Sequence, residues 1–180
     1  LARYSPSIVE RLTPFDPGTP FRRELLRRFE RRLVLTGYFS SATAVIDTDP
    51  GAAAAAPVTL AIIEAPRRRV DAGIGYSTDT LARFNIAYID NDSGAWPLRK
   101  RTELRLESLQ QEITAAVDTA PGKNGWVGTY SAMALRTDIQ DLKTDELIAG
   151  FQRRRPSEIS EPAFGVETVL EQQRRPGAPN

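Results

Sequence analysis

The sequence predicts two parts: a helix–helix–strand–strand region over residues 1–66, and a series of antiparallel strands over residues 67–180. The second prediction rests on strict alternation of apolar and polar residues, which is clearest from Arg69 to Ser77 and recurs down the chain. Side chains of a strand point alternately to opposite faces, so this pattern gives one apolar and one polar face. Repeated alternation indicates a large antiparallel sheet or barrel, and a transmembrane β-barrel is a leading interpretation.

The first part begins with helical signals. Ser5 and Pro6 are residue types favoured at the N-cap and first position of a helix. A second helix is predicted from Phe21 to Thr36, because leucines and a phenylalanine share one face and arginines flank it, and Gly37 follows as a helix-ending residue. Pro14–Gly18 has turn chemistry. The strands Tyr38–Asp47 and Pro57–Glu64 follow, before a linker at Ala65–Arg67.

The second part contains about seven predicted strands of roughly 8–11 residues, the length of tilted membrane-spanning strands. Four aromatic residues on them, Tyr76, Tyr88, Trp126 and Tyr130, are candidates for interfacial girdles. The predicted strands are Arg69–Ser77, Leu81–Asp90, Arg101–Glu107, Gln111–Asp118, Trp126–Arg136, one around Leu147–Phe151 and one around Phe164–Leu170.

Composition excludes several classes of function. The chain of 180 residues has 24 basic and 23 acidic residues, a net charge of +1 that gives no support for a nucleic-acid partner. Histidine and cysteine are absent, which removes the commonest general base, nucleophile and metal ligands. Gly73-Ile74-Gly75 lacks the third glycine of a dinucleotide loop. We therefore expect no enzymatic activity and no cofactor.

Periodicity alone leaves the location of the sheet open. A soluble antiparallel sandwich with one buried face would alternate in the same way. The charges of the polar face, such as Arg101 and Glu103, suit a soluble surface as well as a water-filled lumen.

Three stretches carry a family resemblance. Pro17–Phe21 and Leu35–Ser41 resemble the turn and the helix end of POTRA domains in outer-membrane assembly factors. Glu64–Val70, followed by the string Gly73–Thr80, resembles the junction from the last POTRA domain into the first barrel strand of TamA-type proteins, which are relatives of BamA. The resemblance covers most of the chain and weakens after about residue 120.

This resemblance implies the fold class: a POTRA-like α+β module lacking its first strand (1–66), followed by antiparallel strands of a partial transmembrane β-barrel (67–180). Fewer than half of the strands of the family's closed barrel fit in this chain, so we expect a fragment of a longer protein. The implied location is the bacterial outer membrane, with the POTRA part in the periplasm.

The function implied by the resemblance is assembly or insertion of outer-membrane proteins, without chemistry, by templating client strands. The partners implied are outer-membrane protein clients, outer-membrane lipid and an inner-membrane-anchored, periplasm-spanning protein. The alternatives are a two-partner secretion exporter and a soluble β-rich binding protein. The site residues implied are a lateral-gate strand, with Val70, Gly73, Gly75, Tyr76 and Ser77, and a POTRA edge strand for β-augmentation, with Ser41, Thr43 and Val45.

Overall fold

The computed structural model describes residues 3–46, 56–78, 81–91, 98–122, 125–139, 142–155 and 161–175. The chain divides into two compact units, which we call the N-terminal unit and the strand unit. The N-terminal unit comprises Leu1–Pro66, Ala120–Val127 and Arg154–Pro162. The strand unit comprises Arg67–Thr119, Gly128–Arg153 and Ala163–Asn180. The sequence predicts a single boundary near residue 66, which assigns residues 120–127 and 154–162 to the part with the strands.

Two helices and two strands form the body of the N-terminal unit. The helices begin and end close to where the sequence predicts. Ser5 Oγ accepts a hydrogen bond of 3.3 Å from the backbone N–H of Ser7, which satisfies one of the free donors of the first helical turn. Gly37 has φ 77° and its N–H bonds the carbonyl of Val34 at 2.9 Å, confirming it as the helix-ending residue. The elements are α1 (Ser7–Leu12), α2 (Arg23–Leu35), β1 (Phe39–Ile46) and β2 (Val58–Glu64).

The N-terminal unit has a conventional hydrophobic core. Tyr4, whose ring meets those of Tyr38 and Phe39 edge to face at 5.1 and 5.9 Å, closes one side of it. Leu12 and Leu33 are completely buried. Burial of large apolar side chains therefore stabilises this unit in water. The core consists of Tyr4, Ile8, Leu12, Phe29, Leu33, Tyr38 and Phe39, with Val9, Phe15, Ala42, Leu60 and Ile62 packed against it.

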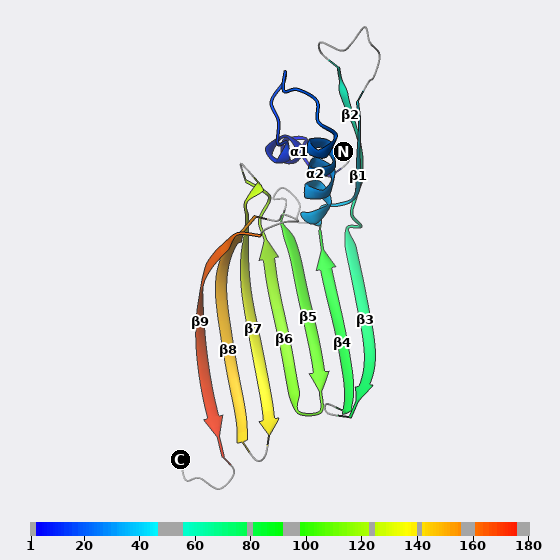
Figure 1. The fold of residues 1–180 in the computed structure, drawn as a ribbon. Coiled ribbons are helices and arrows are strands. Elements are labelled where there is room, and N and C mark those ends of the chain that lie inside the picture. The colour runs from blue at the N-terminus through cyan, green and yellow to red at the C-terminus, as the bar shows by residue number, and fades with distance from the viewer. Residues whose placement is uncertain are drawn as a thin grey trace. The chain divides into compact units, whose positions relative to one another are not determined.

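Strands β1 and β2 pair antiparallel as a two-stranded sheet, and α2 contacts β1 (Figure 1). Ala42 of β1 and Leu60 and Ile62 of β2 pack against the core, whereas Val45 and Ile63 are about 60% exposed (60% and 63%). Side-chain alternation therefore gives this sheet a helix-covered face and an open face. Asp47, which the sequence predicted at the end of β1, lies outside the described residues.

Segments from later in the chain belong to the N-terminal unit as well. A Cβ atom at Gly125, which has φ 77°, would lie 3.4 Å from Leu12 Cδ2 and 3.5 Å from Arg32 Nε. Arg32 also donates a hydrogen bond of 3.3 Å to the carbonyl of Leu12. Burial, together with the nearby charge of Arg155, lowers the pKa of Arg32 below its usual value. The close approach of Gly125 to Leu12 and Arg32 places the segment that contains it with the helices rather than with the strands.

The strand unit is a single sheet of seven strands, arranged in chain order β3-β4-β5-β6-β7-β8-β9 (Figure 1). Consecutive strands from β3 to β7 pair antiparallel without a register shift. Neither described helix of the chain is long and apolar enough to cross a membrane. The strands are β3 (Arg68–Ser77), β4 (Leu81–Asp90), β5 (Arg99–Glu107), β6 (Gln110–Asp118), β7 (Val127–Ile139), β8 (Leu142–Arg154) and β9 (Ala163–Arg174).

The prediction of antiparallel strands is confirmed, with corrections to their ends. β7 begins at Val127, so Trp126 precedes the strand on which the sequence placed it. The hydrogen bond from Gly122 N–H to the Trp126 carbonyl, 2.8 Å long, keeps that residue in a turn of the N-terminal unit. β7 and β8 each have 13 residues and β9 has 12, longer than predicted. The sequence understated them because charged residues such as Arg136 and Asp145 interrupt the alternation near their ends.

Candidate functional site

One face of the seven-stranded sheet is apolar from edge to edge. The cross-strand partners Ile74 and Phe84, Ile86 and Leu104, and Val117 and Tyr130 lie on it. The ring contact between Tyr130 and Phe151, with centroids 4.8 Å apart, shows that β8 continues the same face. We call it the apolar face: Val70, Ala72, Ile74, Tyr76, Ala82, Phe84, Ile86, Tyr88, Thr102, Leu104, Leu106, Ile113, Ala115, Val117, Tyr130, Ala132, Ala134, Leu147, Ala149, Phe151, Phe164, Val166, Thr168 and Leu170.

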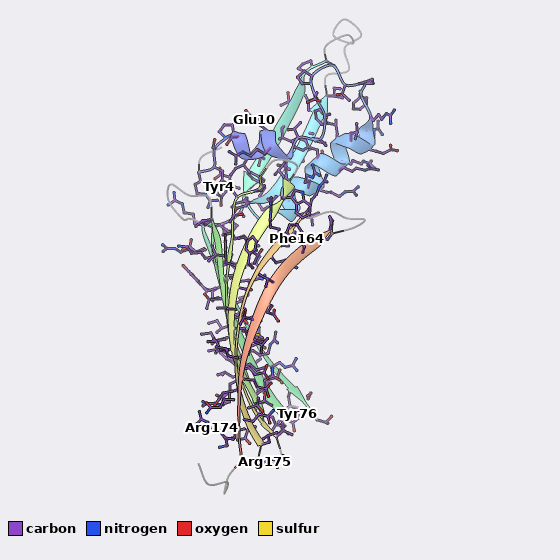
Figure 2. All side chains as sticks on the ribbon, turned by 90° about the vertical axis from the view of Figure 1, so that its left-hand side faces the viewer. Tyr4, Glu10, Tyr76, Phe164, Arg174 and Arg175 are labelled. Carbon is purple, nitrogen blue, oxygen red and sulfur yellow. The ribbon has the colours of Figure 1, made fainter. Side chains whose placement is uncertain are left out.

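Most side chains of the apolar face are exposed, and the remainder, such as Ile86 and Leu104, are half-buried. Ile74 is 89% exposed and Tyr76 76%, and on the last strand Val166 is 68% exposed. Figure 2 shows Tyr76 near one end of the sheet and Phe164 near the other. Monomeric soluble proteins rarely expose contiguous apolar patches larger than a few hundred Å². Contiguous exposure of this kind is therefore unusual for a monomeric soluble protein.

The opposite face carries charges, and on the inner strands several of its carboxylates are better covered than the apolar side chains. Glu107 pairs with Arg83 at 2.7 Å and its side chain is 11% exposed. Glu112 pairs with Arg105 at 3.4 Å and its side chain is 15% exposed. On the same strand as Glu112, Ile113 is 49% exposed. We call this the polar face. In a soluble sandwich the apolar face of a sheet is the buried one, whereas on the inner strands of this sheet the polar face is the better covered one.

Ion pairs and hydrogen bonds neutralise the polar face across strands. Asp118 accepts a 2.6 Å hydrogen bond from Thr129 Oγ1 and pairs with Arg99 at 3.5 Å. Within β5, Glu103 lies 3.3 Å from Arg105. Opposite charges that are cross-strand neighbours, such as Arg99 and Asp118, stabilise the pairing of the strands.

Charged residues return at both ends of the apolar face. At the end where β3 begins, Arg68 and Asp90 are cross-strand partners, as are Asp90 and Lys100. At the other end, Asp145 lies between Arg136, at 2.6 Å, and Arg174, at 3.5 Å. The apolar face is therefore a band bounded by charges on both sides, as an outward-facing membrane band would be.

The predicted gate residues lie on β3, an edge strand, and they divide between the faces. Val70 and Tyr76 lie on the apolar face, and Gly73, Gly75 and Ser77 on the polar face. A Cβ atom at Gly73 would lie 2.6 Å from Oδ1 of Asn85, its cross-strand partner, so the glycine makes room for that side chain. A Cβ atom at Gly75 would meet nothing within 4 Å, so crowding does not explain the second glycine.

The predicted POTRA edge residues lie on β1, whose outer edge is the side that β2 does not occupy. The N–H of Ala44 donates a 2.7 Å hydrogen bond to Glu30 Oε1 of α2 rather than pointing to β2. Because backbone groups alternate in direction along an antiparallel strand, Ser41, Thr43 and Val45 direct theirs to β2. Ala42, Ala44 and Ile46 direct theirs to the outer edge.

Glu30 is a residue that the sequence reasoning missed. It is one of several charged residues of the predicted helix, and no local pattern distinguishes it from Glu24.

Among the residues that the structure describes, no group of three acidic side chains is placed to hold a metal ion.

Comparison with known proteins supports the architecture. Neither a protein-family model nor a curated protein matches the sequence. The fold is similar to that in a crystal structure of BamA from Haemophilus ducreyi lacking POTRA domains 1–3, with a TM-score of 0.67 and 13% sequence identity. The match covers 96% of this chain and 34% of that chain, so the present chain spans about a third of the solved protein. The expected fold is thereby confirmed as BamA-like, with mostly antiparallel strands and few helices.

Proposed function

We propose that this chain is part of an outer-membrane protein assembly factor, in which the strand unit forms part of a barrel wall in the outer membrane. One observation carries the proposal: the apolar face has exposed side chains on every strand, while on the inner strands β4 to β8 the polar face is the better covered one. Lipid tails are the environment that stabilises an exposed apolar band of this kind. A water-filled lumen is the environment that accepts the paired charges of the polar face.

Strand length supports the same location. β3 and β4 have ten residues each and β5 and β6 nine, within the roughly 9–11 residues that a tilted strand needs to span the hydrocarbon layer. A soluble β-rich binding protein would need a cover over the apolar face. Side chains as exposed as Ile74 and Val166 weigh against that alternative.

The N-terminal unit is proposed as a POTRA-like module in the periplasm. Its two helices pack on one face of a two-stranded sheet. The N–H of Arg3 and its guanidinium each donate a 3.0 Å hydrogen bond to the Glu64 carboxylate at the end of β2. These hydrogen bonds hold Arg3 beside the end of β2.

Client strands are proposed to bind at sheet edges, without any covalent step. An edge strand presents unpaired backbone groups that pair with any extended chain, which gives affinity with little sequence specificity. The edge strands are β3 and β9 in the strand unit and β1 and β2 in the N-terminal unit, and we propose β3 and β1 as the client edges. The finer assignment, a translocation and assembly module of the TamA type that acts on autotransporters with an inner-membrane-anchored partner, rests on the sequence strings 17–21, 35–41 and 73–80.

The experiment combines membrane association with client insertion. The purified 180-residue chain is mixed with phospholipid vesicles and floated on a density gradient. It is expected to float with the vesicles and to accelerate the insertion of an unfolded small outer-membrane barrel several-fold. The proposal would be contradicted if the chain stayed monomeric in detergent-free buffer, did not float with the vesicles and did not accelerate client insertion.

A further inference from the structure

The outer edge of β1 is occupied by a side chain of the unit itself. Glu30 Oε1 accepts the Ala44 N–H at 2.7 Å, a short distance for an N–H···O hydrogen bond. A carboxylate oxygen thus takes the position that the backbone carbonyl of a neighbouring strand would take. The acceptor is charged, so the bond is stronger than one between two peptide groups.

The contact also defines the register of any strand that pairs with β1. Ala42, Ala44 and Ile46 share the outward orientation of their backbone groups because they lie two residues apart on a regular strand. By the same alternation, the backbone groups of Thr43 and Val45 point to β2. An added strand must therefore pair through Ala42, Ala44 and Ile46, and at Ala44 it meets Glu30.

An apolar hollow lies where β1 ends, beside Ile46 and its cross-strand partner Val58 of β2. It has a volume of 140 Å³, and Ile46 at the end of β1 is one of its walls. The space accommodates about one apolar side chain of a strand that follows the edge. Its apolar lining includes Phe15, Pro17, Phe21, Leu25, Leu26 and Val58.

We propose that Glu30 holds the outer edge of β1 closed and that an extended client segment binds there by exchange. The client's backbone carbonyl replaces the Glu30 carboxylate at the Ala44 N–H, and one of its apolar side chains enters the hollow beside Ile46. The exchange makes capture reversible, because the released carboxylate competes for the same donor. This inference rests on the proposed function and specifies how the β1 edge is regulated.

The test compares three variants of the full chain in detergent micelles: Glu30→Ala, Glu30→Gln and Glu24→Ala. Glu24 lies in the first turn of the same helix and is exposed, so its variant is a matched control for loss of one carboxylate. The probe is a spin-labelled synthetic peptide with the sequence of β9, Ala163–Arg174, as a model outer-membrane strand. Line broadening of backbone amide signals in NMR spectra locates the bound peptide.

The Glu30→Ala variant is expected to bind the peptide about five- to tenfold more tightly than the unmodified chain, since a charged competitor for a backbone donor is removed. The broadening is expected at Ala42–Ile46. The affinity of Glu30→Gln for the peptide is expected to lie between those of Glu30→Ala and the unmodified chain, because its amide oxygen still accepts the hydrogen bond but carries no charge. Glu24→Ala is expected to match the unmodified chain.

Hydrogen exchange provides a second readout that needs no peptide. In Glu30→Ala the amide of Ala44 is expected to exchange at least tenfold faster, while those of Thr43 and Val45 keep their rates. Unchanged protection at Ala44 would overturn the assignment of Glu30 as its partner.

The outcomes separate this inference from the proposed function. Peptide binding that is equal in all variants, absent in all of them, or tighter in Glu30→Ala but broadened only at β3 or β9 overturns the role of Glu30. None of these results affects vesicle association or client insertion. Conversely, the vesicle experiment can fail while Glu30→Ala still binds the peptide more tightly. That gain would then describe the β1 edge alone.

Discussion

The two units of this molecule obey opposite rules of burial. In the N-terminal unit Leu12 and Leu33 are completely buried, and the apolar side chains of two helices and a sheet face one another. In the strand unit Ile74 is 89% exposed, while the carboxylate of Glu107 on the other face is 11% exposed. One polypeptide thus carries a unit whose apolar side chains cover one another and a unit whose apolar face is left exposed.

The difference teaches that hydrophobic content alone does not locate a protein. Both units contain amphipathic elements, and in each the apolar side chains lie on one face. What differs is whether a second layer covers that face. Because the hydrophobic effect acts only on surface removed from water, the exposed face of the strand unit is stabilised only when lipid or another chain covers it.

The largest effect is expected from matched truncations in the two units. Leu33→Ala, at a completely buried core position, should lower the free energy of unfolding of the N-terminal unit by about 3–5 kcal/mol, because it leaves a cavity. Ile74→Ala, at an exposed position of the strand unit, should change that same free energy of unfolding by less than about 0.5 kcal/mol when both variants are measured in detergent micelles. Urea unfolding followed by circular dichroism measures both. Equal losses would show that Ile74 packs in a core, and the contrast between the units would fail.

The next effect distinguishes the two faces of β3. Ile74→Arg introduces a charge on the apolar face, and Gly75→Arg introduces the same charge one residue away on the polar face, where nothing lies within 4 Å of the new Cβ atom. Ile74→Arg should weaken vesicle association by about 2–4 kcal/mol, the cost of an arginine facing the middle of a bilayer. Gly75→Arg should leave it nearly unchanged. Flotation at graded lipid concentrations measures the partition, and a reversed order would mean that the polar face meets the lipid.

A smaller effect is expected at the entrance to the N-terminal unit. The Glu64 side chain is 12% exposed and accepts hydrogen bonds from the N–H of Arg3 and from its guanidinium, which also bonds the Ala65 carbonyl. Glu64→Ala should cost about 1–3 kcal/mol of stability, because it leaves a partly buried arginine without its counter-charge. Chemical unfolding gives the value. Glu10→Ala, at an exposed carboxylate of α1, is the control and should be neutral within about 0.5 kcal/mol.

The smallest effect is expected at the exposed charges of β3. Arg69 and Asp71 form a 2.8 Å ion pair, but their side chains are 59% and 51% exposed. Water and salt screen such a pair, so Arg69→Ala should change stability by less than about 1 kcal/mol. Glu107→Ala removes the better covered partner of Arg83 and should cost more than Arg69→Ala in the same unfolding assay. Equal costs would show that the polar face is as open to water as the edge of the sheet.

Strand positions and their two faces could be predicted because alternation with a period of two is a local property of the backbone. Val70, Ile74 and Tyr76 were assigned to one side of β3 and Gly73 and Gly75 to the other, and the register of β3 with β4 agrees. Likewise Gly37 could be identified as the end of α2, since its positive φ is a conformation that glycine adopts without strain. Trp126 could not be excluded from β7, because its turn depends on contacts of residues 120–127 within the N-terminal unit.

The amphipathic helical part and the series of alternating strands could be read from neighbouring residues, because both patterns are local. Which face of the strand unit is exposed depends on what covers it, and this is visible only in the folded molecule. The fold also determines that Ala44, and not Ser41, Thr43 or Val45, directs its N–H to the outer edge of β1. The direction of a backbone group relative to an edge is set by which side the partner strand occupies, and that partner is chosen by the fold.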